Sequence, residues 1–248
     1  MTDLVIASPG LVLGPKYLWF FTLTYSMVIV FANWFDPRLI TIFGFTTDAG
    51  TLIFPFTFLL SDILTEVYGY KHARRAIWCG FLFNILFIAY GQLVIHMPSP
   101  NYTTQNEIFD SLLSTNIRII IASSLSYFSS EPLNSFLMAK LKIRMQGHYL
   151  GLRFLASTIV AAGIDSFIFG YLAFFNAMNQ KNLLSLIITM WFIKIVIEFL
   201  GLPISVRLAK KLKKSERLDI YDDNTNFNIF NLSASYLLKD NHYPVTLK

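Results

Sequence analysis

The sequence predicts an all-α, polytopic membrane protein with about six transmembrane helices, and two observations support this. First, 54% of the 248 residues are hydrophobic and only 14% are charged, whereas a soluble domain averages about 25% charged residues. Second, Lys and Arg occur in short groups between long apolar runs, which is typical of loops that face an anionic membrane leaflet. A soluble protein of this composition could not cover its apolar surface.

Six apolar segments are long enough to cross a bilayer, which requires about 20 residues of helix. The expected spans are 17–35, 51–69, 76–96, 117–139, 153–178 and 185–207. We expect residues 1–214 to form a single six-helix domain. Residues 215–248 are polar and rich in Asn, and they are expected to form a cytoplasmic tail with a short amphipathic helix near 230–238.

The distribution of Lys and Arg among the loops predicts that both ends of the chain are cytoplasmic. With that orientation the inner side carries Lys16, Lys71, Arg74, Arg75, Lys140, Lys142, Arg144, Arg153 and the basic cluster at 207–217. The outer side carries only Arg38, Arg118 and Lys181. The outer loops 36–50 and 97–116 are long enough to have structure. The first contains proline, glycine and hydrophobic residues that indicate a hairpin or a lid over a pocket.

The sequence argues against several classes of function. It has no metalloprotease, nucleophile-elbow or nucleotide-binding motif, so we expect neither an enzyme nor an ATPase. Its single cysteine, Cys79, lies in an apolar run and is expected to pack there. No metal site and no cofactor are expected. The net charge of +5 does not indicate nucleic-acid binding, because the basic residues lie in membrane loops.

Ionisable residues within a bilayer are costly, so each one is a candidate functional residue. Asp62 and Asp165 lie near the middle of the second and fifth spans, and Glu131 lies in the fourth. Lys194 and Glu198 lie near the middle of the sixth. At a rise of about 1.5 Å per residue, all should fall within one or two turns of the bilayer centre. The sequence therefore predicts a midplane polar cluster from four helices, which is where transporters place their binding sites.

Some of these residues also have structural explanations that the sequence leaves open. Lys194 and Glu198 are four residues apart on one helix and could neutralise each other. Glu66 lies nearer the inner surface, where it could pair with Arg74 or Arg75. A binding role for Glu66 and Glu198 therefore competes with simple charge compensation.

Asp62 and Asp165 have no oppositely charged neighbour on their own helices, so they are the sharper candidates for binding. Asn134 and Asn84 could line the same cavity or hold helices together by hydrogen bonds. Phe56 could stack on a flat ligand, although most of the 24 phenylalanines should face lipid. These residues complete the candidate site.

The second span carries a more specific signal. IFPFTFLLSDILTEVYGYKHARRAIW (53–78) closely resembles the signature of the queuosine-precursor transporter family, also called the vitamin uptake transporter family. The resemblance continues in IDSFIFGYLAFF (164–175), FIKIVIEFLGLPI (192–204) and ERLDIYDDNTNFNIF (216–230). The positions that match the family pattern are Phe54, Pro55, Asp62, Gly69, Arg74, Arg75, Asp165 and Lys194. Glu66 and Glu198 match only some branches, and Ile229 stands where many relatives have proline.

The resemblance implies a six-span importer in the bacterial inner membrane. Its implied substrates are 7-deazaguanine bases: 7-cyano-7-deazaguanine, 7-aminomethyl-7-deazaguanine or queuine. Such a base presents a ring N–H and an exocyclic amine beside a carbonyl, and one carboxylate can accept both donors. Asp62 or Asp165 would supply that carboxylate, Lys194 or Asn134 a donor for the carbonyl, and a phenylalanine the stacking surface.

Alternatives remain open at this level. The chain could be the substrate-binding subunit of an energy-coupling-factor importer, which also has about six helices and binds flat vitamins. An intramembrane enzyme is a third possibility that the missing motifs disfavour. The expected partners are the base and the lipid bilayer, and a homodimer is also compatible with the sequence. The tail is expected to lie away from the site, unless its FNIF segment (227–230) plugs the inner mouth.

The predicted orientation can be tested with reporter fusions at Asn101 and at the C-terminus. The two reporters should lie on opposite sides of the membrane, because an odd number of spans separates them in the predicted topology. Signals from the same side would contradict the assignment.

Overall fold

The computed structural model describes residues 14–100, 105–114 and 117–244. Within them the helices are α1 (Leu18–Phe35), α2 (Pro55–Tyr68), α3 (Tyr70–Ile95), α4 (Asn106–Ser114), α5 (Ile117–Arg144), α6 (Leu150–Phe174) and α7 (Gln180–Glu216). The remaining elements are the strands β1 (Leu39–Ile42) and β2 (Phe45–Asp48) and the 3₁₀ helices η1 (Gly50–Leu52) and η2 (Leu238–Asp240).

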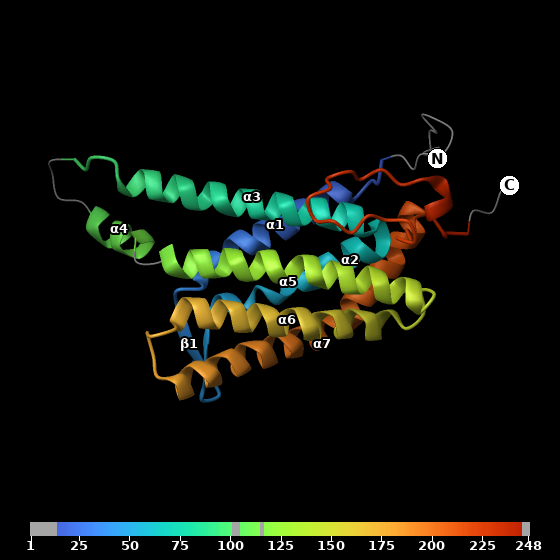
Figure 1. Ribbon diagram of the computed structural model, residues 1–248. Coiled ribbons are helices and arrows are strands. Elements are labelled where there is room, and N and C mark those ends of the chain that lie inside the picture. The colour runs from blue at the N-terminus through green and yellow to red at the C-terminus, as the bar shows by residue number, and fades with distance from the viewer. Residues whose placement is uncertain (1–13, 101–104, 115–116, 245–248) are drawn as a thin grey trace.

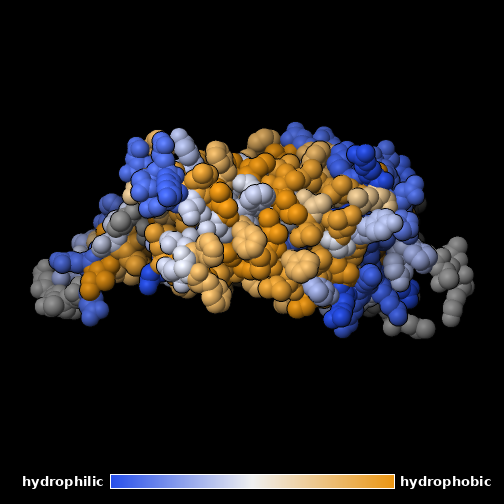
Figure 2. All heavy atoms as spheres, turned by 90° about the horizontal axis from the view of Figure 1, so that it is seen from below, coloured by the Kyte–Doolittle hydropathy of each residue, from blue (hydrophilic) through white to orange (hydrophobic). Residues whose placement is uncertain are grey.

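Five helical segments of the described chain are long and apolar enough to cross a membrane, or six if α4 and α5 count as one bent span. This confirms the predicted all-α polytopic fold. Figure 2 shows an apolar belt across the middle of the visible face, with hydrophilic residues at both ends. The 37 residues of α7 extend about 55 Å, longer than a hydrocarbon core of about 30 Å. Its basic C-terminal part therefore projects beyond the belt.

The long helices run alongside one another, and successive spans alternate in direction (Figure 1). Helix α2 lies at the centre, where it contacts α1, α3, α5, α6 and α7. All of its residues are buried except Phe56 and Leu60. Helix α2 also carries the carboxyl groups of Asp62 and Glu66, which lipid could not solvate. The surrounding helices therefore separate this polar helix from the bilayer.

Residues 36–50 form the expected hairpin. Strands β1 and β2 are antiparallel, with Leu39 opposite Asp48 and Ile42 opposite Phe45. The two turn residues, Phe43 and Gly44, both have positive φ values, of 50° and 85°. Two consecutive turn residues with positive φ give the turn a twist that matches the twist of the paired strands. We call this end of the bundle the hairpin end.

Residues 217–243 lie against the opposite end, which we call the tail end (Figure 1). The helix expected near 230–238 does not form there. Arg74, only 1% exposed, donates from one guanidinium nitrogen to the carbonyls of Asn226 and Asn228 and from another to that of Ser233. These carbonyls bind an arginine of α3, so they cannot close helical hydrogen bonds.

Neighbouring residues of α3 hold the same segment in its extended form. Arg75 donates to the carbonyl of Leu232 at 2.7 Å, and Lys71 donates to that of Ser235 at 2.8 Å. The aromatic residues of the FNIF segment contact α3 and α5 through Tyr70, Trp78, Phe128 and Phe136. The tail is therefore a folded strap across the tail end of the bundle.

Gly69, between α2 and α3, lets the strap approach closely. It has a φ of +84°, and a Cβ atom there would lie 2.4 Å from the Tyr236 hydroxyl oxygen. That hydroxyl accepts from the backbone N–H of Lys71 and donates to Asp222 at 2.6 Å. Burial, together with the Asp222 carboxylate, raises the pKa of Tyr236 well above its usual value. The phenol therefore remains a donor at neutral pH.

Arg74→Lys should release the strap, because a lysine cannot reproduce the fixed fork of a guanidinium that binds three carbonyls. We expect limited proteolysis of the purified protein to cut within residues 226–236 at least several-fold faster than in the parent. The matched control is Arg75→Lys, at an exposed residue whose guanidinium makes a single bond to the strap. Equal protection of Arg74→Lys and the parent would contradict this role of Arg74.

Candidate functional site

A group of buried polar side chains lies in the interior of the bundle, around the middle of α2. It consists of Asp62 on α2, Glu131 and Asn134 on α5, and Glu198 on α7, all 0% exposed. We call these four residues the acceptor cluster. The carboxyl of Asp62 interacts electrostatically with those of Glu198 and Glu131. The structure thus brings together three of the ionisable residues that the sequence predicted at a common depth, and it adds Asn134, which was expected to line the same cavity or to join helices.

Hydrogen bonds fix part of this cluster. The Asn134 amide donates to Oδ1 of Asp62 at 2.7 Å, and the Ser157 hydroxyl lies 3.5 Å from the same oxygen. The Thr57 hydroxyl donates to Glu131. These bonds fix one oxygen of the Asp62 carboxyl and one oxygen of the Glu131 carboxyl.

Within the described residues, several buried acceptor atoms of the cluster have no hydrogen-bond partner. They are Oδ2 of Asp62, Oε2 of Glu131, Oδ1 of Asn134 and both carboxyl oxygens of Glu198. Leaving a buried polar group unpaired costs about 1–3 kcal/mol, and more if it is charged. Five such atoms are a large cost for a fold, so these side chains are the candidates for receiving hydrogen-bond donors from outside the chain.

A second buried group lies nearer the hairpin end. Lys194 forms an ion pair with Asp165, which also accepts from Ser130 at 3.1 Å. The lysine ammonium lies 4.8 Å from the ring centre of Phe54. A pairing of Lys194 with Glu198 on the same helix is therefore not the arrangement found. Asp165 binds the ammonium, and Glu198 is left without it.

Two members of this second group were not predicted from the sequence. Asp36 and Asp48 flank the hairpin and line the same small cavity as Asp165 and Lys194. Asp36 is held close to Gly50, where a Cβ atom would lie 1.8 Å from its carboxyl oxygen. Burial and the nearby Asp48 raise the pKa of Asp36 well above its usual value. The only signal was two acidic residues in a mostly apolar loop, which does not reveal that the loop folds inward.

The position of Phe56 differs from the expectation that this residue could stack on a flat ligand. Its side chain is 48% exposed, whereas Phe54 and Phe58 are 6% and 0% exposed. Residues four apart share a helix face, and a residue midway between them points away. Phe56 therefore faces outward, on the side of the helix expected to face lipid. Phe54, beside Lys194, is the aromatic residue that lies near the buried charges.

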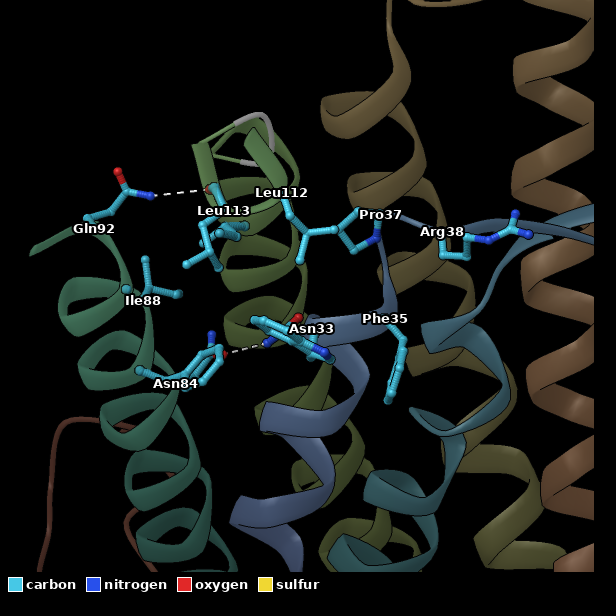
Figure 3. A pocket seen from close by; sticks show the side chains of 13 residues that line it. Asn33, Phe35, Pro37, Arg38, Asn84, Ile88, Gln92, Leu112 and Leu113 are labelled. Carbon is cyan, nitrogen blue, oxygen red and sulfur yellow. Dashed lines mark hydrogen bonds between the residues drawn. The ribbon is translucent and has the colours of Figure 1, made fainter. Parts of the chain in front are cut away.

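Asn84 belongs to a different place from the acceptor cluster. Its side-chain oxygen accepts from the Asn33 amide at 2.7 Å, and the oxygen of Asn33 accepts from the Ser123 hydroxyl. The two asparagines line a pocket of about 380 Å³ between α1, α3, α4 and α5 (Figure 3). The other lining residues are mostly apolar. The amide pair therefore joins helices at the edge of an apolar pocket.

Glu66 does not pair with Arg74 or Arg75, contrary to one sequence-based expectation. Its carboxylate contacts the guanidinium of Arg153 at 2.5 Å and also pairs with Lys213, while Lys142 lies 4.0 Å away. Arg74 instead binds the strap. Three cations surround this buried carboxylate, so its charge is already compensated.

Asp219 of the strap completes this network at the tail end. It lies 2.7 Å from both Lys142 and Lys213. The resulting network links α2, α5, α6, α7 and the strap. Glu66 and its partners therefore hold the tail end closed, one turn of α2 away from Asp62.

Two proteins of known name resemble this chain over most of its length. It is 27% identical over 191 residues to the "Probable queuosine precursor transporter" of Bacillus subtilis (strain 168), covering 76% of this chain and 82% of that protein. It is 25% identical over 213 residues to the "Queuosine precursor transporter" of Escherichia coli (strain K12), covering 81% and 92%. No solved structure matches the chain.

The sequence profile of the family described as "Putative vitamin uptake transporter" matches residues 48–208. That segment begins at the end of the hairpin and runs through most of α7. It includes the whole acceptor cluster and the ion pair of Asp165 with Lys194. It also contains all of α2 to α6, and it ends before the strap. The chain therefore belongs to the vitamin uptake transporter family, and it is a multi-pass transport protein of the bacterial inner membrane rather than an enzyme.

Proposed function

We propose that this protein imports queuosine precursors, that is 7-deazaguanine bases, through the acceptor cluster. The names of its two relatives support this class of substrate. The observation that carries the proposal is the set of acceptor atoms on Asp62, Glu131, Asn134 and Glu198 that have no partner within the described residues. A site with free acceptors requires a ligand rich in donors.

A deazaguanine offers such donors along one edge. Its ring N–H and exocyclic amine point in the same direction, and a carboxylate accepts both at once. Asp62 is suited to this role, because Asn134 fixes one of its oxygens and leaves the other unpartnered. The free carbonyl of Asn134 can accept a further N–H. Lys194, one helical turn from Glu198, is a candidate donor for the base carbonyl.

The cluster is closed to both sides in this structure. Toward the tail end it is covered by the network of Glu66, Arg153 and Lys213. Toward the hairpin end lies the ion pair of Asp165 and Lys194. A buried central site with a closure on either side fits alternating access. Because the sequence encodes no nucleotide-binding motif, transport would be facilitated or secondary.

Asp62→Asn should abolish import. It replaces a carboxylate that accepts two donors with an amide that presents its own N–H groups to the ligand. A hydrogen bond to a charged group contributes about 1.5–3 kcal/mol, so affinity should fall roughly tenfold to a hundredfold. Import is measured as uptake of a labelled deazaguanine in a host that cannot make queuosine, scored by tRNA modification.

The purified variant serves as its own control for folding. Its melting temperature should stay close to that of the parent, because Asp62 makes no ion pair within the described residues. Parental melting together with parental affinity for 7-cyano-7-deazaguanine would refute the assignment of Asp62.

Asp165→Asn should abolish import as well, but it should also destabilise the fold. The change leaves the buried ammonium of Lys194 without its partner, which typically costs about 3–5 kcal/mol. The double variant Asp165→Asn/Lys194→Met removes both charges and should recover most of the melting temperature. Thermal unfolding of the parent, the single variant and the double variant measures this directly. A single variant as stable as the parent would show that the pair has no structural role.

A further inference from the structure

The three carboxyl groups of the acceptor cluster share the interior with no cation of their own. Within the described residues, every ion pair involves Glu66, Asp165 or Asp219, and none involves Asp62, Glu131 or Glu198. The nearby cations are already bound: Lys194 by Asp165 and Arg153 by Glu66. The centre of the bundle therefore has a local excess of acidic groups.

Glu198 is the least compensated of the three. Asp62 accepts from Asn134, and Glu131 accepts from Thr57 and has the Tyr25 hydroxyl beside it. Both oxygens of Glu198 lack a hydrogen-bond partner, and the side chain is 0% exposed. The charged groups that interact with it are the other two carboxyls of the cluster.

Lys194 does not supply the missing charge, although it lies one turn away on α7. Its ammonium is bound to Asp165 and lies over the ring of Phe54. A buried carboxylate is strongly disfavoured unless a cation or several donors approach it. Glu198 therefore favours a ligand that brings a positive charge of its own.

A neutral deazaguanine does not satisfy this requirement. Its two adjacent N–H donors pair with a single carboxylate, Asp62 in the proposed binding mode, and leave Glu198 unpaired. A base that also carries a short amine arm adds an ammonium, because a primary alkylamine has a pKa near that of lysine, about 10.4. An ammonium and a carboxylate form a charge-assisted hydrogen bond, roughly twice as strong as a neutral one.

We propose that Glu198 selects substrates with a cationic amine arm, so that the protein prefers 7-aminomethyl-7-deazaguanine to the neutral 7-cyano base. This inference rests on the proposed function, since it assigns a further contact within the same site. Asp62 recognises the base and Glu198 recognises the charge of the arm. The two carboxyls thereby have separate roles in affinity and selectivity.

The test is equilibrium binding of three bases to the purified full-length protein in lipid nanodiscs at neutral pH. The bases are 7-aminomethyl-, 7-hydroxymethyl- and 7-cyano-7-deazaguanine. The hydroxymethyl arm matches the aminomethyl arm in size and can donate a hydrogen bond, but it has no charge. We expect the aminomethyl base to bind at least tenfold more tightly than either neutral base. This comparison uses the parent protein alone, so it does not depend on the folding of a variant.

Two variants then locate the selectivity. Glu198→Gln should lower the affinity for the aminomethyl base tenfold or more and change that for the cyano base less than threefold. Glu131→Gln is the matched control, because it also removes a buried carboxyl of the cluster but one that already has donors. It should retain the preference for the aminomethyl base, whatever its effect on overall affinity.

The outcomes separate this inference from the proposed function. If none of the bases binds, the proposed function fails. If the bases bind within threefold of one another, the function stands and the selectivity for charge is refuted. Equal loss of both affinities in Glu198→Gln, or loss of the preference in Glu131→Gln, would also overturn the role of Glu198.

Discussion

The architecture depends on one constraint: a bilayer cannot solvate a charge, and α2 carries two carboxyl groups. A helix with Asp62 and Glu66 on neighbouring turns can enter the membrane only if protein surrounds it. The other spanning helices contact α2, and 12 of its 14 residues are buried. The same helix is thereby held at the centre of the bundle, where we propose that the substrate binds.

Compensation of charge varies along the axis of the bundle. At the tail end, Glu66 has three cations around it and is tied to the strap through their shared partner Asp219. Nearer the hairpin end, Asp165 is paired with Lys194. Between these two groups the carboxyls of the acceptor cluster have no cation. In the proposed function, the paired charges close the two ends of the path, and the unpaired acceptors bind the donors of the substrate.

The strap shows how a sequence pattern can mislead. Residues 230–238 were expected to include a short amphipathic helix, yet no α-helix forms there, because α3 provides donors for the carbonyls of Leu232, Ser233 and Ser235. A buried arginine with three carbonyl partners outweighs the weak helix propensity of a segment rich in Asn and Ser. Because those donors lie more than 150 residues earlier in the sequence, no local pattern could have revealed them.

The sequence by itself determined the fold class, the apolar segments long enough to span a membrane and the hairpin, since these follow from hydropathy and turn residues. It also singled out Asp62, Glu131, Asn134 and Glu198 as polar residues within those segments. Tertiary structure decided the pairings: Lys194 binds Asp165 rather than Glu198, and Glu66 binds Arg153 rather than Arg74. It also turned Phe54 inward and Phe56 outward. Depth is a property of one helix, whereas a partner depends on how neighbouring helices are rotated and packed, and no single segment encodes that.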